Sequence, residues 1–92
     1  MNDMSNTPQT VEAPHNLSAE AGVLGAILYD NNAFQRVADI LRTSDFYSIP
    51  HQEIFEVCST MIQGGRVADG ITLREHFEKA DKLQELSRQL QA

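Results

Sequence analysis

Apolar residues recur at helical spacing along most of the chain, which predicts an all-α protein. The apolar positions of a first helix, over residues 17–29, are Leu17, Ala21, Leu24 and Leu28, with Val23 and Ile27 widening the stripe. Asn16 or Ser18 is placed to cap this helix, because a side-chain oxygen there accepts a hydrogen bond from a first-turn amide. Gly22 and Gly25 each weaken a helix interior, so we expect another backbone to pack closely against them.

A second helix is predicted after the polar stop Asp30-Asn31-Asn32. Asn32, with Gln35 three residues later, forms a capping-box pattern at its start. Its buried stripe contains Phe34, Val37, Ala38 and Leu41, with Ile40 beside it. After a polar turn come two adjacent aromatic residues, Phe46 and Tyr47, a pair that we expect to plug the end of a core.

Two further helices follow the aromatic pair. Ser48-Ile49-Pro50 opens a third helix, since proline is tolerated in a first turn, and Gly64-Gly65 ends it. Its apolar face consists of Ile54, Val57, Cys58, Met61 and Ile62, with Phe55 adjacent. Thr72 and Glu75 form a second capping box ahead of a fourth helix. The apolar positions that follow are Leu73, Phe77, Leu83, Leu86 and Leu90, so residues 81–92 either extend this helix or form a fifth.

The chain divides into a polar arm and one helical domain. Residues 1–13 contain Pro8 and show no sustained period, and we expect a disordered arm because they bury too little apolar surface to offset the entropy of ordering. Residues 14–92 are predicted to form a small compact bundle of four to five short helices. No segment convincingly predicts a β-strand.

Composition narrows the classes of function. The 92 residues carry 7 Lys and Arg against 13 Asp and Glu, a net charge of −6, which argues against direct nucleic-acid binding by this chain. The single cysteine, Cys58, excludes an internal disulfide framework and agrees with a reducing compartment. The N-terminus shows no signal-peptide pattern, and the longest apolar run, residues 23–29, is too short to span a bilayer.

The sequence also lacks the patterns of the common catalytic and cofactor sites. No glycine precedes a lysine, so a phosphate-binding loop for a nucleoside triphosphate is excluded. His15, His51 and His76 are far apart and stand beside one thiol, so no zinc site is expected. We therefore predict no catalytic, cofactor-binding or metal-binding residues in this chain.

For three groups of residues, a structural role is favoured over a catalytic or nucleic-acid-binding role. Cys58 and His51 lie about 10 Å apart along one helix, too far for a thiol–imidazole hydrogen bond, so a buried structural thiol is favoured. The two later histidines are interpreted as surface or capping residues, and glutamate pairs such as Glu53 with Glu56 as solvated faces. The aromatic residues that might stack on bases lack interleaved cations, so core packing is favoured for Tyr29, Phe46 and Tyr47.

Much of the chain, roughly residues 14–86, closely resembles the N-terminal domain of DnaB-type bacterial replicative helicases. The resemblance rests on a run of short matches in the order of that domain. The first are Pro14-His15-Asn16-Leu17, Ala19-Glu20, Val23-Leu24-Gly25-Ala26-Ile27-Leu28 and Asp30-Asn31. The later ones are Phe34, Val37-Ala38, Leu41, Asp45-Phe46-Tyr47, His51, Ile54-Phe55, Gly65, Asp69 and Ile71-Thr72-Leu73. The chain departs from the family pattern at Ser18, Ala21 and Gly70, and after Leu86, where a Gly-Gly turn is usual.

The resemblance implies a head domain that assembles with other proteins. In that family a separate C-terminal motor carries ATP and Mg, and the head joins a collar of paired subunits and receives primase. It therefore implies primase, other helicase subunits and a helicase loader as partners, in the bacterial cytoplasm and away from any membrane. By itself the chain is expected to be a monomer or weak dimer that neither hydrolyses ATP nor unwinds DNA.

Two alternatives and one surface complete the expectations. A naturally short helicase-head mimic that regulates primase, loader or helicase is the alternative function, favoured by the polar run after Leu86. A small enzyme using His51 or Cys58 is the remaining class. We expect the partner-binding residues on the polar face of the last helices, at Arg74, Glu78, Asp81 and Glu85.

Overall fold

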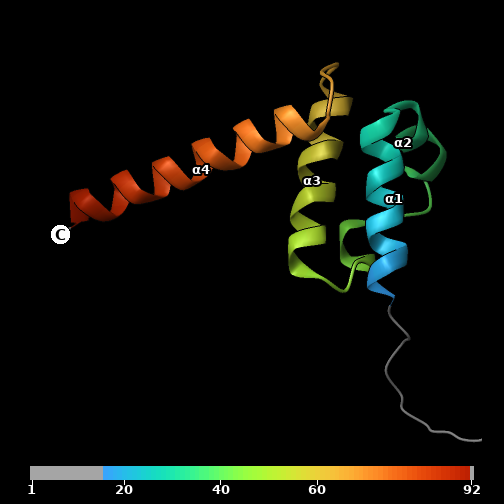
Figure 1. The fold of residues 1–92 in the computed structure, drawn as a ribbon, viewed down its shortest axis with the longest axis horizontal. Helices are drawn as coiled ribbons and strands as arrows, with labels where there is room; N and C mark the ends of the chain where they lie inside the picture. The colour runs from blue at the N-terminus through green and yellow to red at the C-terminus, as the bar shows by residue number, and fades with distance from the viewer. Residues whose placement is uncertain (1–15, 92) are drawn as a thin grey trace, which may run out of the picture.

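A computed structural model describes residues 16–91, and every regular element in that range is helical. The elements are α1 (Leu17–Tyr29), α2 (Asn32–Val37), the 3₁₀ helix η1 (Thr43–Asp45), α3 (Ile49–Gln63) and α4 (Gly70–Gln91). Helices α1 and α3 lie side by side, and α4 projects away from this pair as a long helix (Figure 1). Helix α2 packs against α1, and η1 packs against α3. The all-α prediction is confirmed, whereas the predicted arm lies outside the described residues.

A cluster of three phenylalanine rings forms the centre of the core. Phe55 on α3 lies 5.9 Å from Phe34 of α2 and 5.0 Å from Phe46, measured between ring centroids. The other buried members of the core are Leu24, Ile27, Cys58, Met61, Ala68 and Leu73. Phe55, which the periodicity placed only beside the apolar face, is therefore at the middle of the core.

The exposed aromatics correct part of the core prediction. Phe46 is buried as expected, because the chain between η1 and α3 turns its ring inward onto Phe55. Tyr47 is 55% exposed and Tyr29 is 93% exposed, so core packing is wrong for both. Ile40 is also exposed, whereas Ala38 and Leu41 in the same turn pack against the core as predicted.

Helix α1 begins where one of the two predicted caps stands, but the first two residues of its predicted apolar stripe are exposed. The Asn16 side chain accepts a hydrogen bond of 3.0 Å from the Ala19 amide. Leu24 and Ile27 are buried, whereas Leu17 is 49% exposed and Ala21 is also exposed. The inward face follows positions 20, 24 and 27, which share one side of a helix. The predicted stripe is therefore right for Val23, Leu24, Ile27 and Leu28, which are buried or packed against the core, and wrong for Leu17 and Ala21.

The two glycines of α1 do not mark a close helix contact. A Cβ built on Gly22 or Gly25 would meet nothing within 4 Å, and both residues are exposed. No backbone among the described residues packs against them, so the expected close approach is wrong within this chain. Both glycines instead lie on an open face of the helix.

Helix α2 is capped by a different device from the one predicted. The Asn32 side chain makes no capping bond, and the Asn32 amide donates to Asp30 Oδ1 at 3.0 Å. Asn31 instead bridges two distant segments, because its Nδ2 donates to the carbonyls of Ile27 and Ala68 and its Oδ1 accepts from the Ala68 amide at 2.9 Å. This side chain fastens the segment before α4 to the end of α1.

Helix α3 matches its prediction at both ends. The Ser48 hydroxyl accepts a hydrogen bond from the His51 amide at 3.3 Å, and Pro50 lies in the first turn, where no amide partner is needed. Gly64 ends the helix, and Gly65 adopts a positive φ of 78° that favours glycine. The chain can therefore reverse toward α4 within a few residues.

Helix α4 starts earlier than predicted and extends well beyond the residues that contact the core. Asp69 and Thr72 cap it reciprocally: the Thr72 amide donates to Asp69 Oδ1 at 2.9 Å, and the Asp69 amide donates to Thr72 Oγ1 at 2.8 Å. The box of Thr72 with Glu75 was wrong because the helix already begins at Gly70. Leu73 is buried and Phe77 half-buried, but residues 78–91 are all exposed. We call residues 78–91 the projecting segment; the helix extends rather than breaking into a fifth.

Candidate interaction surface

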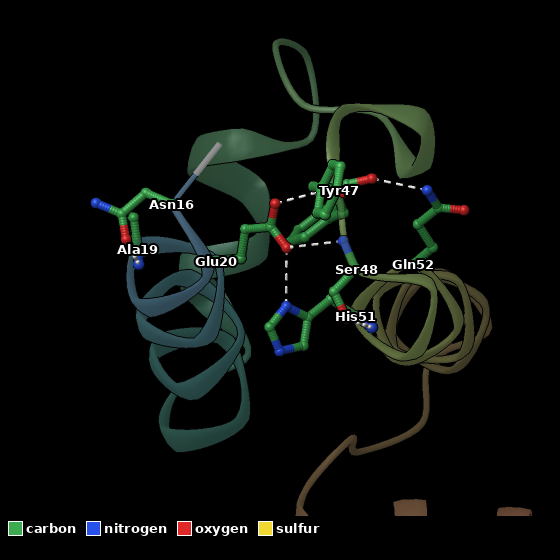
Figure 2. Close-up of polar contacts among 8 residues, drawn as sticks. Asn16, Ala19, Glu20, Tyr47, Ser48, His51 and Gln52 are labelled. Atoms are coloured by element: carbon green, nitrogen blue, oxygen red, sulfur yellow. Dashed lines mark hydrogen bonds and ion pairs between the residues drawn. The ribbon is translucent and has the colours of Figure 1, made fainter. Parts of the chain in front are cut away.

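The carboxylate of Glu20 reaches from α1 to the start of α3, where it contacts two backbone amides and an imidazole (Figure 2). Its Oε2 accepts a hydrogen bond from the Tyr47 amide at 2.7 Å. Its Oε1 accepts from the Ser48 amide at 3.3 Å and lies 2.8 Å from Nδ1 of His51. Beside it, Gln52 Nε2 donates to the Phe46 carbonyl at 2.7 Å. The contacts of Glu20 tie the loop before α3 and the first turn of α3 to the first turn of α1.

The electrostatics of this cluster favour an ionised carboxylate. The hydrogen bond from His51 and then that from the Tyr47 amide lower the pKa of Glu20, because both stabilise the charged form. Glu20 belongs to the first turn of α1, but its carboxylate lies at the N-terminus of α3. His51 was expected to be a surface or capping residue, and its ring is instead half-buried against Glu20. Both oxygens of the carboxylate are engaged in holding the fold.

The candidate nucleophile is buried in the core. Cys58 is 0% exposed, and burial raises the pKa of its thiol, which disfavours the reactive thiolate. The prediction of a buried structural thiol is confirmed. Across residues 16–91, no group of three His, Cys, Asp or Glu side chains is arranged to hold a metal ion.

The four predicted partner-binding residues share one long helix. Arg74, Glu78, Asp81 and Glu85 are all exposed on α4, and their spacing of four, three and four places them on one side of it. Glu85 pairs with Arg88 one turn later, and Gln89 Nε2 donates to its other oxygen at 3.5 Å. Among the described residues, no hydrogen bond or ion pair joins these four side chains to another element. Their role in binding stays a prediction.

Three leucines of the projecting segment are uncovered. Leu83 is 67% exposed, Leu86 50% and Leu90 87%, because α4 has already left the core when it reaches them. Their spacing of three and four places them along one side of the helix. The segment therefore carries a short apolar stripe as well as charged positions.

A pocket of about 380 Å³ lies where the end of α3 meets the first turns of α4. It is lined by Met61, Arg66, Val67, Thr72, Glu75, His76 and Lys79. The sequence analysis missed this pocket. Its signal was the turn at Gly64-Gly65, which folds Arg66 back toward helix positions 72, 76 and 79, but that signal depends on where α4 begins.

The fold and surface together define a class of protein. The molecule is a small helical domain with a packed core and a buried thiol. Its half-buried polar side chains Glu20, Asn31 and Asp69 form hydrogen bonds that cap helices or join segments. Its accessible features include a projecting helix and the pocket beside that helix. Within residues 16–91, none of the helices is both long and apolar enough to cross a membrane. Such features are typical of a domain that contacts other proteins.

The chain belongs to the family of DnaB-like helicase N-terminal domains, whose family model matches residues 12–91. It is 37% identical over 86 residues to the replicative DNA helicase DnaB of Treponema pallidum, a match covering 90% of this chain and 20% of that protein. The DnaB of Buchnera aphidicola from Schizaphis graminum is 37% identical over 75 residues, covering 82% and 16%. That of Rickettsia felis is 32% identical over 85 residues, covering 92% and 17%. The chain thus spans a fifth or less of the length of these relatives.

Proposed function

We propose that this chain is the non-catalytic head of a replicative DNA helicase, which docks with primase and with neighbouring heads during DNA replication in the bacterial cytoplasm. The observation that carries the proposal is the family match over residues 12–91. The relatives are helicases of which this chain corresponds to only a small part, so the ATP-dependent motor is assigned to another part of such a protein. The helicase loader is a further partner of the same kind.

The surface of α4 supports an interaction role. The stripe of Arg74, Glu78, Asp81 and Glu85 is exposed, charged and presented on a rigid helix, which is a frequent way of displaying a recognition surface. The half-buried ionisable groups do not offer comparable chemistry, because the Glu20 carboxylate is occupied by two amides and an imidazole. We accordingly propose no ATP hydrolysis or DNA unwinding by this chain.

A titration of the 92-residue chain with the helicase-binding domain of a bacterial primase tests the proposal. We expect saturable binding by calorimetry, weakened in the double variant Glu78→Lys with Asp81→Lys because a partner complementary to the acids would now meet cations. Glu53→Lys, an exposed reversal on α3, is the matched control. Absence of binding by the unmodified chain at high protein concentration, or measured ATP turnover free of contaminant, would contradict the proposal.

The unbroken path of α4 favours a second candidate. The helix continues through Ser87, Arg88 and Gln89 to Gln91, where the family pattern usually turns through Gly-Gly. A short head mimic that regulates primase, loader or helicase would use the same surface without a motor. The reading frame downstream of Ala92 separates the two candidates, because a motor domain follows in the first and a stop in the second.

A further inference from the structure

The pocket between α3 and α4 combines an apolar floor with a cationic wall. Met61, only 6% exposed, forms part of the floor, and Val67, 63% exposed, lies at the edge. Arg66 comes from the loop after Gly65, and Lys79 comes from α4, in the second turn beyond Leu73. The two cationic side chains that line the pocket therefore come from different parts of the fold.

The charge of this pocket is opposite to that of the chain. Two of the 7 Lys and Arg residues line it, together with His76, in a protein whose net charge is −6. Glu75 is the one acid among the lining residues. Within the described part of the chain, neither Arg66 nor Lys79 forms an ion pair, since the ion pairs there join Glu20 with His51 and Glu85 with Arg88. The cations are thus available to a ligand.

We propose that this pocket receives an acidic segment of a partner protein, with an aspartate or glutamate carboxylate between Arg66 and Lys79 and a neighbouring apolar side chain on Met61 and Val67. Guanidinium and ammonium groups form charge-assisted hydrogen bonds with carboxylates, and two cations on separate elements would hold such a group from two sides. The volume of about 380 Å³ suits a few side chains rather than a whole helix.

The chemistry favours a peptide carboxylate over nucleic-acid phosphate. A nucleic acid presents phosphates in a row, and the exposed acids Glu75 and Glu78 on the same helix would repel those beyond the first. An apolar floor gives a phosphate chain no favourable contact, whereas it suits the leucine or isoleucine that accompanies acids in an amphipathic segment. The inference depends on the proposed interaction role for its expectation of a protein partner.

The test is an NMR titration of the isotope-labelled 92-residue chain with a capped acidic tetrapeptide, acetyl-Leu-Asp-Glu-Leu-amide. We expect saturable shifts of the amides of Arg66, Val67 and Lys79, and none with the basic counterpart acetyl-Leu-Lys-Lys-Leu-amide. Lys79→Gln should weaken binding about tenfold, the loss typical of one charge-assisted contact. Glu75→Gln should strengthen it, because the variant removes the one negative charge from the lining.

Arg36→Gln, an exposed change on α2, is the matched control and should leave the peptide affinity unchanged. Equal peptide affinity of Lys79→Gln and the unmodified chain overturns the inference, as does the absence of shifts at millimolar peptide. Equivalent shifts with single-stranded DNA would assign the cations to phosphate and also overturn it. Binding of the primase domain without peptide binding would support the proposed function and reject the pocket. Peptide binding without binding of the primase domain would support the pocket and reject the proposed function.

Discussion

At the scale of single residues, Glu20 shows how one carboxylate organises a junction between segments far apart in the sequence. It joins α1 to two amides and a ring some thirty positions later (Figure 2). The amides of Tyr47 and Ser48 lie at the N-terminal end of α3, where the helix dipole also favours a negative charge. The sequence placed Glu20 in a first turn, but the helix it serves follows only from the tertiary fold.

Glu20→Gln should make the protein less stable at neutral pH and less sensitive to acid. Because the folded state lowers the pKa of Glu20, its contribution is present above the ordinary carboxyl pKa of about 4.3 and is lost as the pH falls through the folded-state pKa. The measurement is the urea midpoint of both proteins from pH 7 to pH 3, where the difference should shrink with acid. Glu53→Gln, which changes an exposed glutamate on α3, should show no such trend. A difference that stays constant with pH would contradict the charged role of Glu20.

Gly22→Ala and Gly25→Ala should each stabilise the isolated chain by about 0.5–1 kcal/mol, because alanine loses less conformational freedom in a helix. The open space around both positions leaves room for the added methyl group. The check is the unfolding free energy from chemical denaturation, with Gly65→Ala as the contrasting variant. Gly65 has a φ of 78°, so its substitution should destabilise the protein. Loss of stability in the two helix variants would mean that another segment covers this face.

At the scale of elements, the apolar periodicity correctly identified the helices, but the residues at which α2 and α4 are capped were predicted less well. Helix α3 was predicted at both ends because its cap, its proline and its glycines are unambiguous. Helix α4 was assigned a start near Thr72, although Asp69 is the cap, because Asp and Thr are both good capping residues and stand three positions apart. The start of the inward face of α1 was misjudged for a related reason: it carries the polar Glu20, and an apolar stripe cannot reveal a half-buried polar side chain.

Phe55→Ala should cost about 3–5 kcal/mol, the range for removing a large ring from a packed core. Phe55 is 4% exposed and contacts the rings of Phe34 and Phe46, so the deletion leaves a cavity shared by three elements. For a domain of this size that loss could unfold it, and thermal melting followed by circular dichroism measures it. Leu90→Ala is the comparison, since a leucine 87% exposed should change stability by less than about 0.5 kcal/mol. An unchanged melting temperature for Phe55→Ala would contradict the core as described.

At the scale of the whole molecule, the position of α4 determines which surface features can be predicted from the sequence. The charged stripe from Arg74 to Glu85 follows from helical periodicity alone, so it was predictable. The pocket beside Lys79 was not, because it requires the α3–α4 turn to bring Arg66 against a helix whose first residue had been misplaced. The projecting direction of α4 depends on the few contacts that Leu73 and Phe77 make with the core, and no local pattern specifies it (Figure 1).

The same geometry bears on assembly. Residues 78–91 stand clear of the core and expose Leu83, Leu86 and Leu90, so self-association of the chain should use this stripe. Three partly exposed leucines offer much less than the roughly 800 Å² per partner of a standard stable interface. We therefore expect the 92-residue chain to be a monomer or a weak dimer at micromolar concentrations in sedimentation velocity. Leu86→Glu should remove any dimer, while Ile40→Glu, a change at an exposed apolar residue outside the stripe, should not. A stable hexamer, or a dimer insensitive to Leu86→Glu, would place the contact elsewhere, with the open glycine face of α1 as the surface to test next.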